Sequence, residues 1–131
     1  MKKTALLNQP LSSLIAELGH TDTVLVADAG LPCPQGPRRI DLALCPGIPG
    51  FIDTVRTIVT EMHVEEALVA EEFLSASPHL YQELLATLPG IPVRTLPHHE
   101  LKALSPSVKG MVRTGEFSPY ANVILQSGVV F

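Results

Sequence analysis

The first residues able to do chemistry are a histidine and an aspartate that flank an apolar run. His20 lies just before residues 23–27, and Asp28 lies just after them. An imidazole, with an ordinary pKa of about 6.5, gives and takes protons near neutral pH, and a nearby carboxylate favours its protonated form. We predict that His20 is a general acid oriented by Asp28, the two meeting at one edge of a sheet. The alternative is that His20 caps a helix end while Asp28 bonds the turn at Gly30.

A second pair of candidates is His98 and Lys102, which lie four residues apart. In a helix these two side chains share one face, so they could line one pocket. The alternative is a solvated helix face that carries its charges without a ligand. No metal site is predicted, because no further ligands at suitable spacing complete one.

Residues 113–122 form a third candidate region, with the sequence RTGEFSPYAN. Most of these side chains can bond hydroxyl groups, and Tyr120 adds a flat apolar face, which are properties of a sugar pocket. The alternative is an ordered turn in which Arg113 pairs with Glu116. Glycine-rich phosphate loops and the nucleophile elbow of hydrolases are absent, which argues against phosphate transfer and covalent hydrolysis.

Helical and strand periodicities indicate the elements that must position these residues. Helices are predicted at 11–18, 55–62 and 77–88, with one or two helical turns at 97–104. Strands are predicted at 23–27, 39–42, 67–70, 91–96, 108–112 and 122–125, and the proline-rich segment 31–50 is predicted to be an ordered loop. The alternation predicts the α/β class: a three-layer α/β/α sandwich with a mostly parallel or mixed sheet, forming a single domain over 1–131.

Composition limits the partners and the compartment. The chain has 131 residues, 46% hydrophobic and 17% charged, so we expect other subunits to cover part of its surface in a homo-oligomer. A net charge of -4 without a basic stripe argues against nucleic acid. No apolar run approaches the roughly 18 residues that cross a bilayer, so we expect a cytoplasmic protein without a membrane partner. Cys33 and Cys45 are expected to be reduced thiols.

Taken together, residues 19–22, 27–32 and 113–122, with His98 and Lys102, closely resemble the D-ribose pyranase family. The similarity runs nearly end to end and includes Asn8, residues 40–42, residues 46–49 and the closing 128–131. It implies a cofactor-free isomerase that interconverts the pyranose and furanose rings of D-ribose. This activity would follow ribose uptake and supply the ring form that a ribose kinase uses.

The resemblance also implies roles for individual residues. His20 matches the proton donor of the family, and Lys102 matches a basic residue near the substrate pocket. The sugar-binding positions match Asp28, His98, Tyr120 and Asn122. The family pattern has one histidine four positions before the lysine, which selects His98 over His99. The resemblance further implies a decamer of two stacked pentameric rings with sites at subunit contacts.

Two other functions remain open from the sequence. One is a mutarotase for L-fucose or another monosaccharide, whose family shares the early histidine and aspartate motifs but differs over residues 113–122. The other is a noncatalytic sugar-binding accessory protein of a transport system, in which the same residues bind a sugar without accelerating its exchange.

Overall fold

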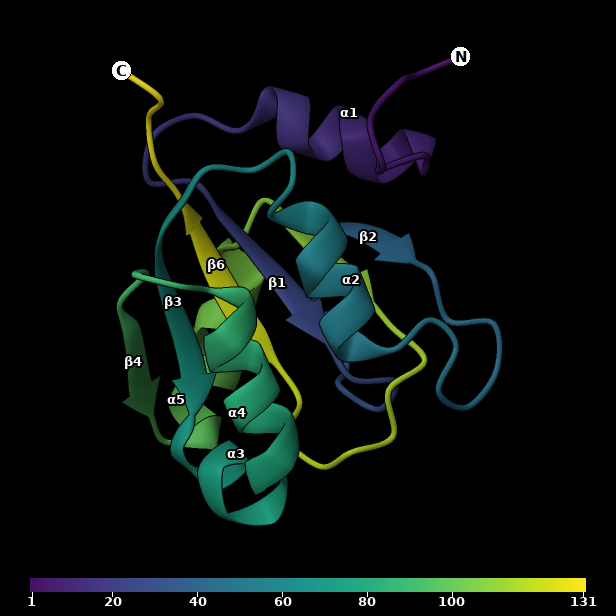
Figure 1. The fold of residues 1–131 in the computed structure, drawn as a ribbon. Helices are drawn as coiled ribbons and strands as arrows, with labels where there is room; N and C mark the ends of the chain where they lie inside the picture. The colour runs from purple at the N-terminus through teal and green to yellow at the C-terminus, as the bar shows by residue number, and fades with distance from the viewer.

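The computed structural model describes residues 1–131 and is built around one six-stranded sheet (Figure 1). Its spatial order is β2-β5-β1-β6-β3-β4. Strand β6 is antiparallel to both of its neighbours, and every other pairing is parallel. The strands are β1 (Thr23–Ala27), β2 (Arg38–Asp41), β3 (Val64–Ala70), β4 (Val93–Leu96), β5 (Gly110–Arg113) and β6 (Val123–Ser127). The mixed sheet predicted from the sequence is confirmed.

Helices cover both faces of this sheet and complete the predicted sandwich (Figure 1). The helices are α1 (Gln9–Glu17), α2 (Phe51–Ile58), α3 (Glu71–Ala76), α4 (Pro78–Thr87) and α5 (His98–Leu104), with a 3₁₀ turn, η1, at Ser105–Ser107. Buried residues of α1 to α4 join one apolar cluster, whereas Leu101 of α5 joins a separate cluster on the other face. No helix combines the length and the apolar character that crossing a membrane requires.

Strand β1 is covered on both faces of the sheet, which explains why its sequence is a continuous apolar run. Val24 and Val26 face the cluster under α1 to α4, and Leu25 and Ala27 face the cluster under α5. Because successive side chains of a strand point to opposite faces, a strand covered on both sides must be apolar at every position. The prediction of a buried strand at 23–27 is confirmed.

Two helices depart from the prediction. Helix α2 begins at Phe51, earlier than the predicted 55, because the proline-rich loop ends at Pro49 and Gly50 leads directly into the helix. Helix α3 was not predicted, since residues 71–76 bury only Phe73 and show little helical periodicity. Glu71 and Glu72 stand in its first turn, where acidic side chains complement the helix dipole.

The topology creates two functional edges of the sheet. The carboxyl ends of the five parallel strands and the amino end of β6 lie at one edge, which we call the carboxyl edge. The amino ends of the parallel strands and the carboxyl end of β6 form the opposite, amino edge. In α/β sheets, ligands bind at the carboxyl edge, where loops gather.

Candidate functional site

Asp28 and Asn122 meet at the carboxyl edge. Asp28 directly follows β1 and Asn122 directly precedes β6, so the antiparallel pairing of these neighbouring strands places the residues side by side. The backbone N–H of Asp28 donates to Asn122 Oδ1, and Asn122 Nδ2 donates to Asp28 Oδ2, both at 2.9 Å. Asn122 is fully buried, so these bonds satisfy an amide that would otherwise be costly to bury.

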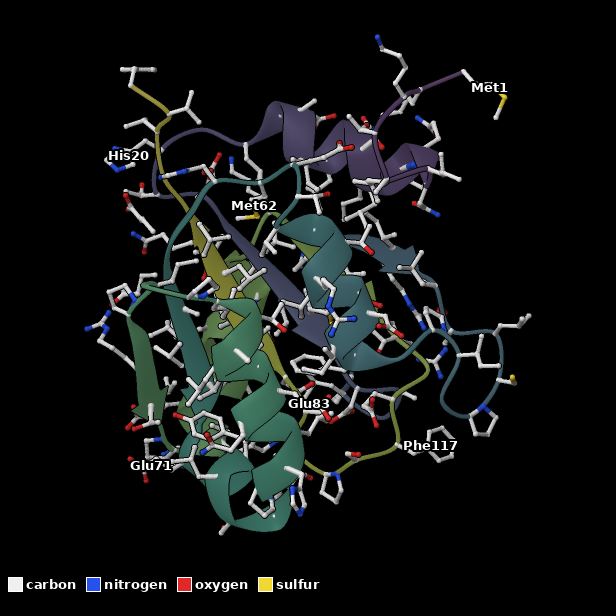
Figure 2. All side chains as sticks on the ribbon, viewed as in Figure 1. Met1, His20, Met62, Glu71, Glu83 and Phe117 are labelled. Atoms are coloured by element: carbon white, nitrogen blue, oxygen red, sulfur yellow. The ribbon has the colours of Figure 1, made fainter.

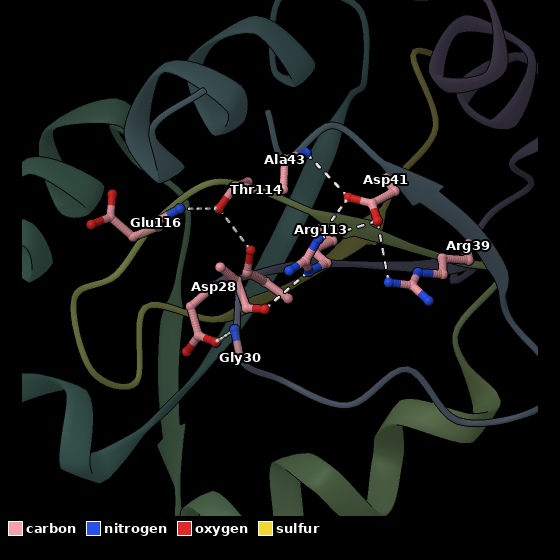
Figure 3. A network of polar contacts seen from close by, with 10 residues as sticks. Asp28, Gly30, Arg39, Asp41, Ala43, Arg113, Thr114 and Glu116 are labelled. Atoms are coloured by element: carbon pink, nitrogen blue, oxygen red, sulfur yellow. Dashed lines mark hydrogen bonds and ion pairs between the residues drawn. The ribbon is translucent and has the colours of Figure 1, made fainter. Parts of the chain in front are cut away.

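The Asp28 carboxylate is fixed a second time by the turn that follows β1. Its Oδ1 accepts hydrogen bonds from the backbone N–H groups of Gly30 at 2.9 Å (Figure 3) and Leu31 at 2.8 Å. The turn at Gly30 that the sequence offered as an alternative role is therefore present. It is compatible with ligand binding, because a carboxylate has about four lone-pair sites and these contacts use three.

A pocket of about 330 Å³ opens beside Asp28. His98 and Lys102 both line it from α5, as their spacing predicts, and Tyr120 lines it from the loop before β6. The backbone N–H of His98 donates to Glu72 Oε2 at 2.9 Å, which ties the start of α5 to α3. The complete lining is Asp28, Gly30, Leu31, Pro32, His98, Lys102, Pro119 and Tyr120.

His98 and Tyr120 form an aromatic wall of this pocket. Their ring centroids lie 5.0 Å apart and the rings meet edge to face at 82°. His98 Nδ1 is buried and has no hydrogen-bond partner within the chain. Such an unpartnered nitrogen is rare in folded proteins and marks His98 as a candidate functional residue. Tyr120 has a φ of 61°, a left-handed conformation that an L side chain adopts at a cost, as residues at ligand sites often do.

A second pocket, of about 350 Å³, adjoins the first and shares Asp28, Gly30 and Pro119 with it. Arg113 contributes to its wall, donating from Nε to the Ala29 carbonyl at 2.9 Å and from Nη1 to both Asp41 oxygens at 3.2 Å (Figure 3). Burial favours the neutral form of Asp41, but the N–H of Ala43 and the Arg113 guanidinium outweigh it, so the pKa of Asp41 is lowered.

The alternative pairing of Arg113 with Glu116 is wrong. Strands β2 and β5 are neighbours, and their register places Asp41 opposite Arg113, so the guanidinium finds its carboxylate across the sheet. The backbone N–H of Glu116 donates a hydrogen bond to Thr114 Oγ1 at 3.2 Å (Figure 3).

The Glu116 side chain organises the loop between β5 and β6. Its Oε2 accepts from the Phe51 N–H at 3.1 Å, and its Oε1 accepts from the Ser118 N–H at 3.1 Å and hydroxyl at 2.8 Å. Burial raises the pKa of Glu116. The hydrogen bonds from the Ser118 hydroxyl and from the N–H groups of Phe51, Ser118 and Phe117 outweigh burial, so the pKa of Glu116 is lowered. The charged carboxylate thereby ties the loop that carries Tyr120 to the first turn of α2.

His20 lies at the amino edge, away from all these residues. The predicted contact between His20 and Asp28 is wrong within one chain, because the five residues of β1 separate them by about 17 Å at about 3.3 Å per strand residue. Figure 2 shows His20 near the carboxyl terminus, at the opposite end of the molecule from Glu71 and Phe117. Its Nε2 contacts Glu65 Oε2 at 3.2 Å, and its side chain is 55% exposed. His20 also does not cap α1, which ends with Leu18 as its C-cap.

The family model described as the RbsD / FucU transport protein family matches residues 1–130. The chain belongs to this family. Relatives named D-ribose pyranase include one from Chloroflexus aggregans, 56% identical, and one from Coprothermobacter proteolyticus, 53% identical, each matched over the full length of both chains. The solved structure of Bacillus subtilis RbsD complexed with D-ribose superposes with a TM-score of 0.96 at 44% identity, covering all of both chains. The resemblance stated from the sequence is confirmed.

Three residues of this RbsD / FucU chain that contact candidate site residues or the loop beside them were not found from the sequence: Glu65, Glu72 and Ser77. The helix predicted at 77–88 begins at Pro78, and the Ser77 hydroxyl makes no cap hydrogen bond. It donates instead to the Pro119 carbonyl at 3.0 Å, beside Tyr120. No local signal could reveal a bond between residues 42 apart in the chain.

Proposed function

We propose that this chain is a D-ribose pyranase, an isomerase that interconverts the pyranose and furanose forms of D-ribose. The observation that carries the proposal is the carboxyl-edge pocket, where Asp28, His98, Lys102 and Tyr120 converge in a chain 56% identical to a D-ribose pyranase over its whole length. Its structural relative from Bacillus subtilis was solved with D-ribose bound. A polar pocket with one aromatic wall suits a small polyol.

Each pocket residue has a feature that suits a sugar hydroxyl. The Asp28 carboxylate retains an acceptor site, and the hydrogen bond from Asn122 holds this carboxylate in one orientation. The unpartnered His98 Nδ1 supplies a second polar contact, and the Lys102 ammonium supplies donors. Tyr120 supplies an apolar face for the carbon side of the ring. These residues bind and orient D-ribose for ring opening.

The proton donor in this proposal is His20. Protonated His20 gives its proton to the ring oxygen, which also takes the electron pair of its bond to the anomeric carbon. The anomeric hydroxyl releases a proton as its oxygen forms the aldehyde carbonyl, and a different hydroxyl then closes the other ring. One proton enters and one leaves in each direction, and no electron is transferred, so the reaction needs no redox cofactor.

Because β1 separates His20 from the pocket, His20 must serve the pocket of a neighbouring copy. We place the site at subunit contacts, where the amino edge of one copy meets the carboxyl edge of another. The exposure of His20 and of Phe117, which is 69% exposed beside the second pocket, supports such contacts. The assembly proposed is a decamer of two stacked pentamers. It would act in the cytoplasm, after ribose uptake and before a ribose kinase.

Magnetisation-transfer NMR on D-ribose at equilibrium tests this function. We expect wild-type protein to accelerate exchange between pyranose and furanose signals above the buffer rate, and His20→Ala to abolish the acceleration while leaving ribose bound. His79→Ala is the matched control, because His79 is exposed on α4 and lies outside both pockets. Ribose binding without acceleration by wild type would favour a noncatalytic binding protein. Faster exchange of L-fucose anomers than of ribose rings would favour a mutarotase.

A further inference from the structure

Glu65 is the carboxylate that contacts His20. It lies near the start of β3 at the amino edge, and its Oε2 is 3.2 Å from His20 Nε2. The Glu65 side chain is 34% exposed, compared with 55% for His20, so the carboxylate is the more enclosed partner. This arrangement is the histidine–carboxylate pair that the sequence assigned to His20 and Asp28.

Glu65 is itself held in place from strand β6. Gln126 Nε2 donates to Glu65 Oε1 at 2.6 Å, so the two carboxylate oxygens have separate partners. Gly128 leaves room for this group and for His63, since a Cβ there would lie 2.7 Å from His63 Cδ2 and 3.1 Å from both Cβ and Oε2 of Glu65. The Gln126 bond lowers the pKa of Glu65 most, burial opposes it, and His20 and His63 lower it further, so the net shift is downward.

The backbone beneath His20 is also fixed. Asp22 Oδ2 accepts from the Gly19 N–H at 2.9 Å, which closes the loop around His20. The Thr21 N–H donates to the Ser127 carbonyl at 2.9 Å, and the Ser127 N–H donates to the Asp22 carbonyl at 2.8 Å. Thr21 has a φ of 68°, a strained conformation for a β-branched residue. The loop therefore presents His20 to Glu65 from a defined backbone.

We propose that Glu65 positions His20 for proton transfer, with Gln126 holding Glu65 in turn. The proposal rests on the proposed function, in which His20 is the proton donor. With Nε2–H of the imidazolium donating to Glu65, Nδ1 is the nitrogen that exchanges a proton with the sugar of the neighbouring copy. Glu65 acts through His20 and does not line the sugar pocket, so it is a positioning residue.

Substitution of Glu65 separates its effect on rate from any effect on binding. We expect Glu65→Ala to reduce ring exchange at saturating ribose about tenfold, part of the roughly 10²- to 10⁴-fold effect of a positioned acid. Glu65→Gln keeps an acceptor for Nε2–H and should lose less. Ribose affinity, measured by calorimetry, should change less than about twofold, because the pocket residues are untouched.

Glu66→Gln is the matched control. It removes the same charge from the next residue of β3, but Glu66 pairs with Arg94 and does not contact His20. This control should exchange ribose at the wild-type rate. If Glu65→Ala misfolds, Glu65→Gln carries the test, because it preserves the shape of the side chain.

A titration of Glu65 provides a readout that does not depend on activity. Carbon-13 NMR of the Glu65 carboxyl should show its pKa rising in His20→Ala and in Gln126→Leu, because each variant removes a hydrogen-bond partner that favours the charged carboxylate. Full exchange activity in both Glu65 variants, with His20→Ala inactive, would overturn the positioning role and leave the proposed function standing. Full activity in His20→Ala would instead overturn the proton donor itself.

Discussion

Asp28 and Asn122 exchange two hydrogen bonds of 2.9 Å between the end of β1 and the start of β6. One bond is donated by the backbone N–H of Asp28 and the other is accepted by its carboxylate. The buried side-chain amide of Asn122 therefore fixes both the backbone at Asp28 and the orientation of the Asp28 carboxylate. The carboxyl edge is thus preorganised before any ligand arrives. Preorganisation lowers the entropic cost of binding a small polyol.

Asn122→Ala should weaken both stability and ribose binding. The substitution leaves the Asp28 N–H without its partner and frees the carboxylate to turn, which should cost about 1–3 kcal/mol of unfolding free energy. Urea denaturation measures this loss, and calorimetry measures the ribose affinity. A variant that keeps wild-type stability and wild-type affinity would contradict the role assigned to the pair.

Ser77→Ala should weaken ribose binding with little effect on the exchange rate at saturation. The Ser77 hydroxyl holds the Pro119 carbonyl at 3.0 Å, one residue before Tyr120. Its loss should let the loop and the Tyr120 ring move, and we expect an affinity loss of about fivefold, as for a net hydrogen bond of about 1 kcal/mol. Ser75→Ala is the control, because its hydroxyl bonds only the local Glu72 carbonyl. Equal affinities in the two variants would rule out this anchor.

Glu116 should make the stability of the folded chain depend on pH. Its pKa is lowered in the folded chain, so the unfolded chain binds the proton more readily. The stabilisation is therefore complete above the ordinary glutamate pKa of about 4.3 and is lost as pH falls through the lower, folded value. We expect Glu116→Gln to be less stable than wild type at pH 7, with the difference shrinking towards pH 3. Thermal unfolding across this range measures it, and a constant difference at every pH would exclude the charge as the cause.

Thr21→Asn should stabilise the chain. Thr21 is exposed and adopts a φ of 68°, which asparagine tolerates better than a β-branched residue. We expect a gain of about 0.5–1 kcal/mol in chemical denaturation. The exchange rate should stay at the wild-type value, since the backbone that carries His20 is preserved. A loss of stability would show that the threonine side chain makes a compensating contact.

The sequence predicted elements whose signals are local. The apolar run of β1, the helical periodicity of α1, and the spacing of His98 and Lys102 all depend on neighbours in the chain. Contacts set by strand order could not be predicted this way. The Asp41–Arg113 pair requires β2 beside β5. The separation of His20 from Asp28 is different, because it follows from the predicted strand 23–27 itself, whose two ends cannot meet.

Asn122 illustrates the same limit within the site. The resemblance assigned it to sugar binding, but its bonds to Asp28 depend on β6 entering the sheet antiparallel to β1. Glu65 depends on the same strand, because Gln126 reaches it from β6. Residue types and spacing therefore indicated the sugar-binding candidates, whereas the topology determined which residues hold them.

A mixture of two inactive variants should recover activity. His20→Ala lacks the proposed proton donor of the amino edge, and His98→Ala lacks a pocket residue of the carboxyl edge. If each site takes these residues from different copies, randomly mixed oligomers regain about one quarter of the wild-type rate, because both residues are intact at one contact in four. Coexpression with two different tags isolates the mixed oligomers, and native mass spectrometry verifies their composition. If one copy supplied both residues, every site in the mixture would retain one substitution. The mixed oligomers would then exchange ribose no faster than the average of the two parents, and the placement of the site between copies would be wrong.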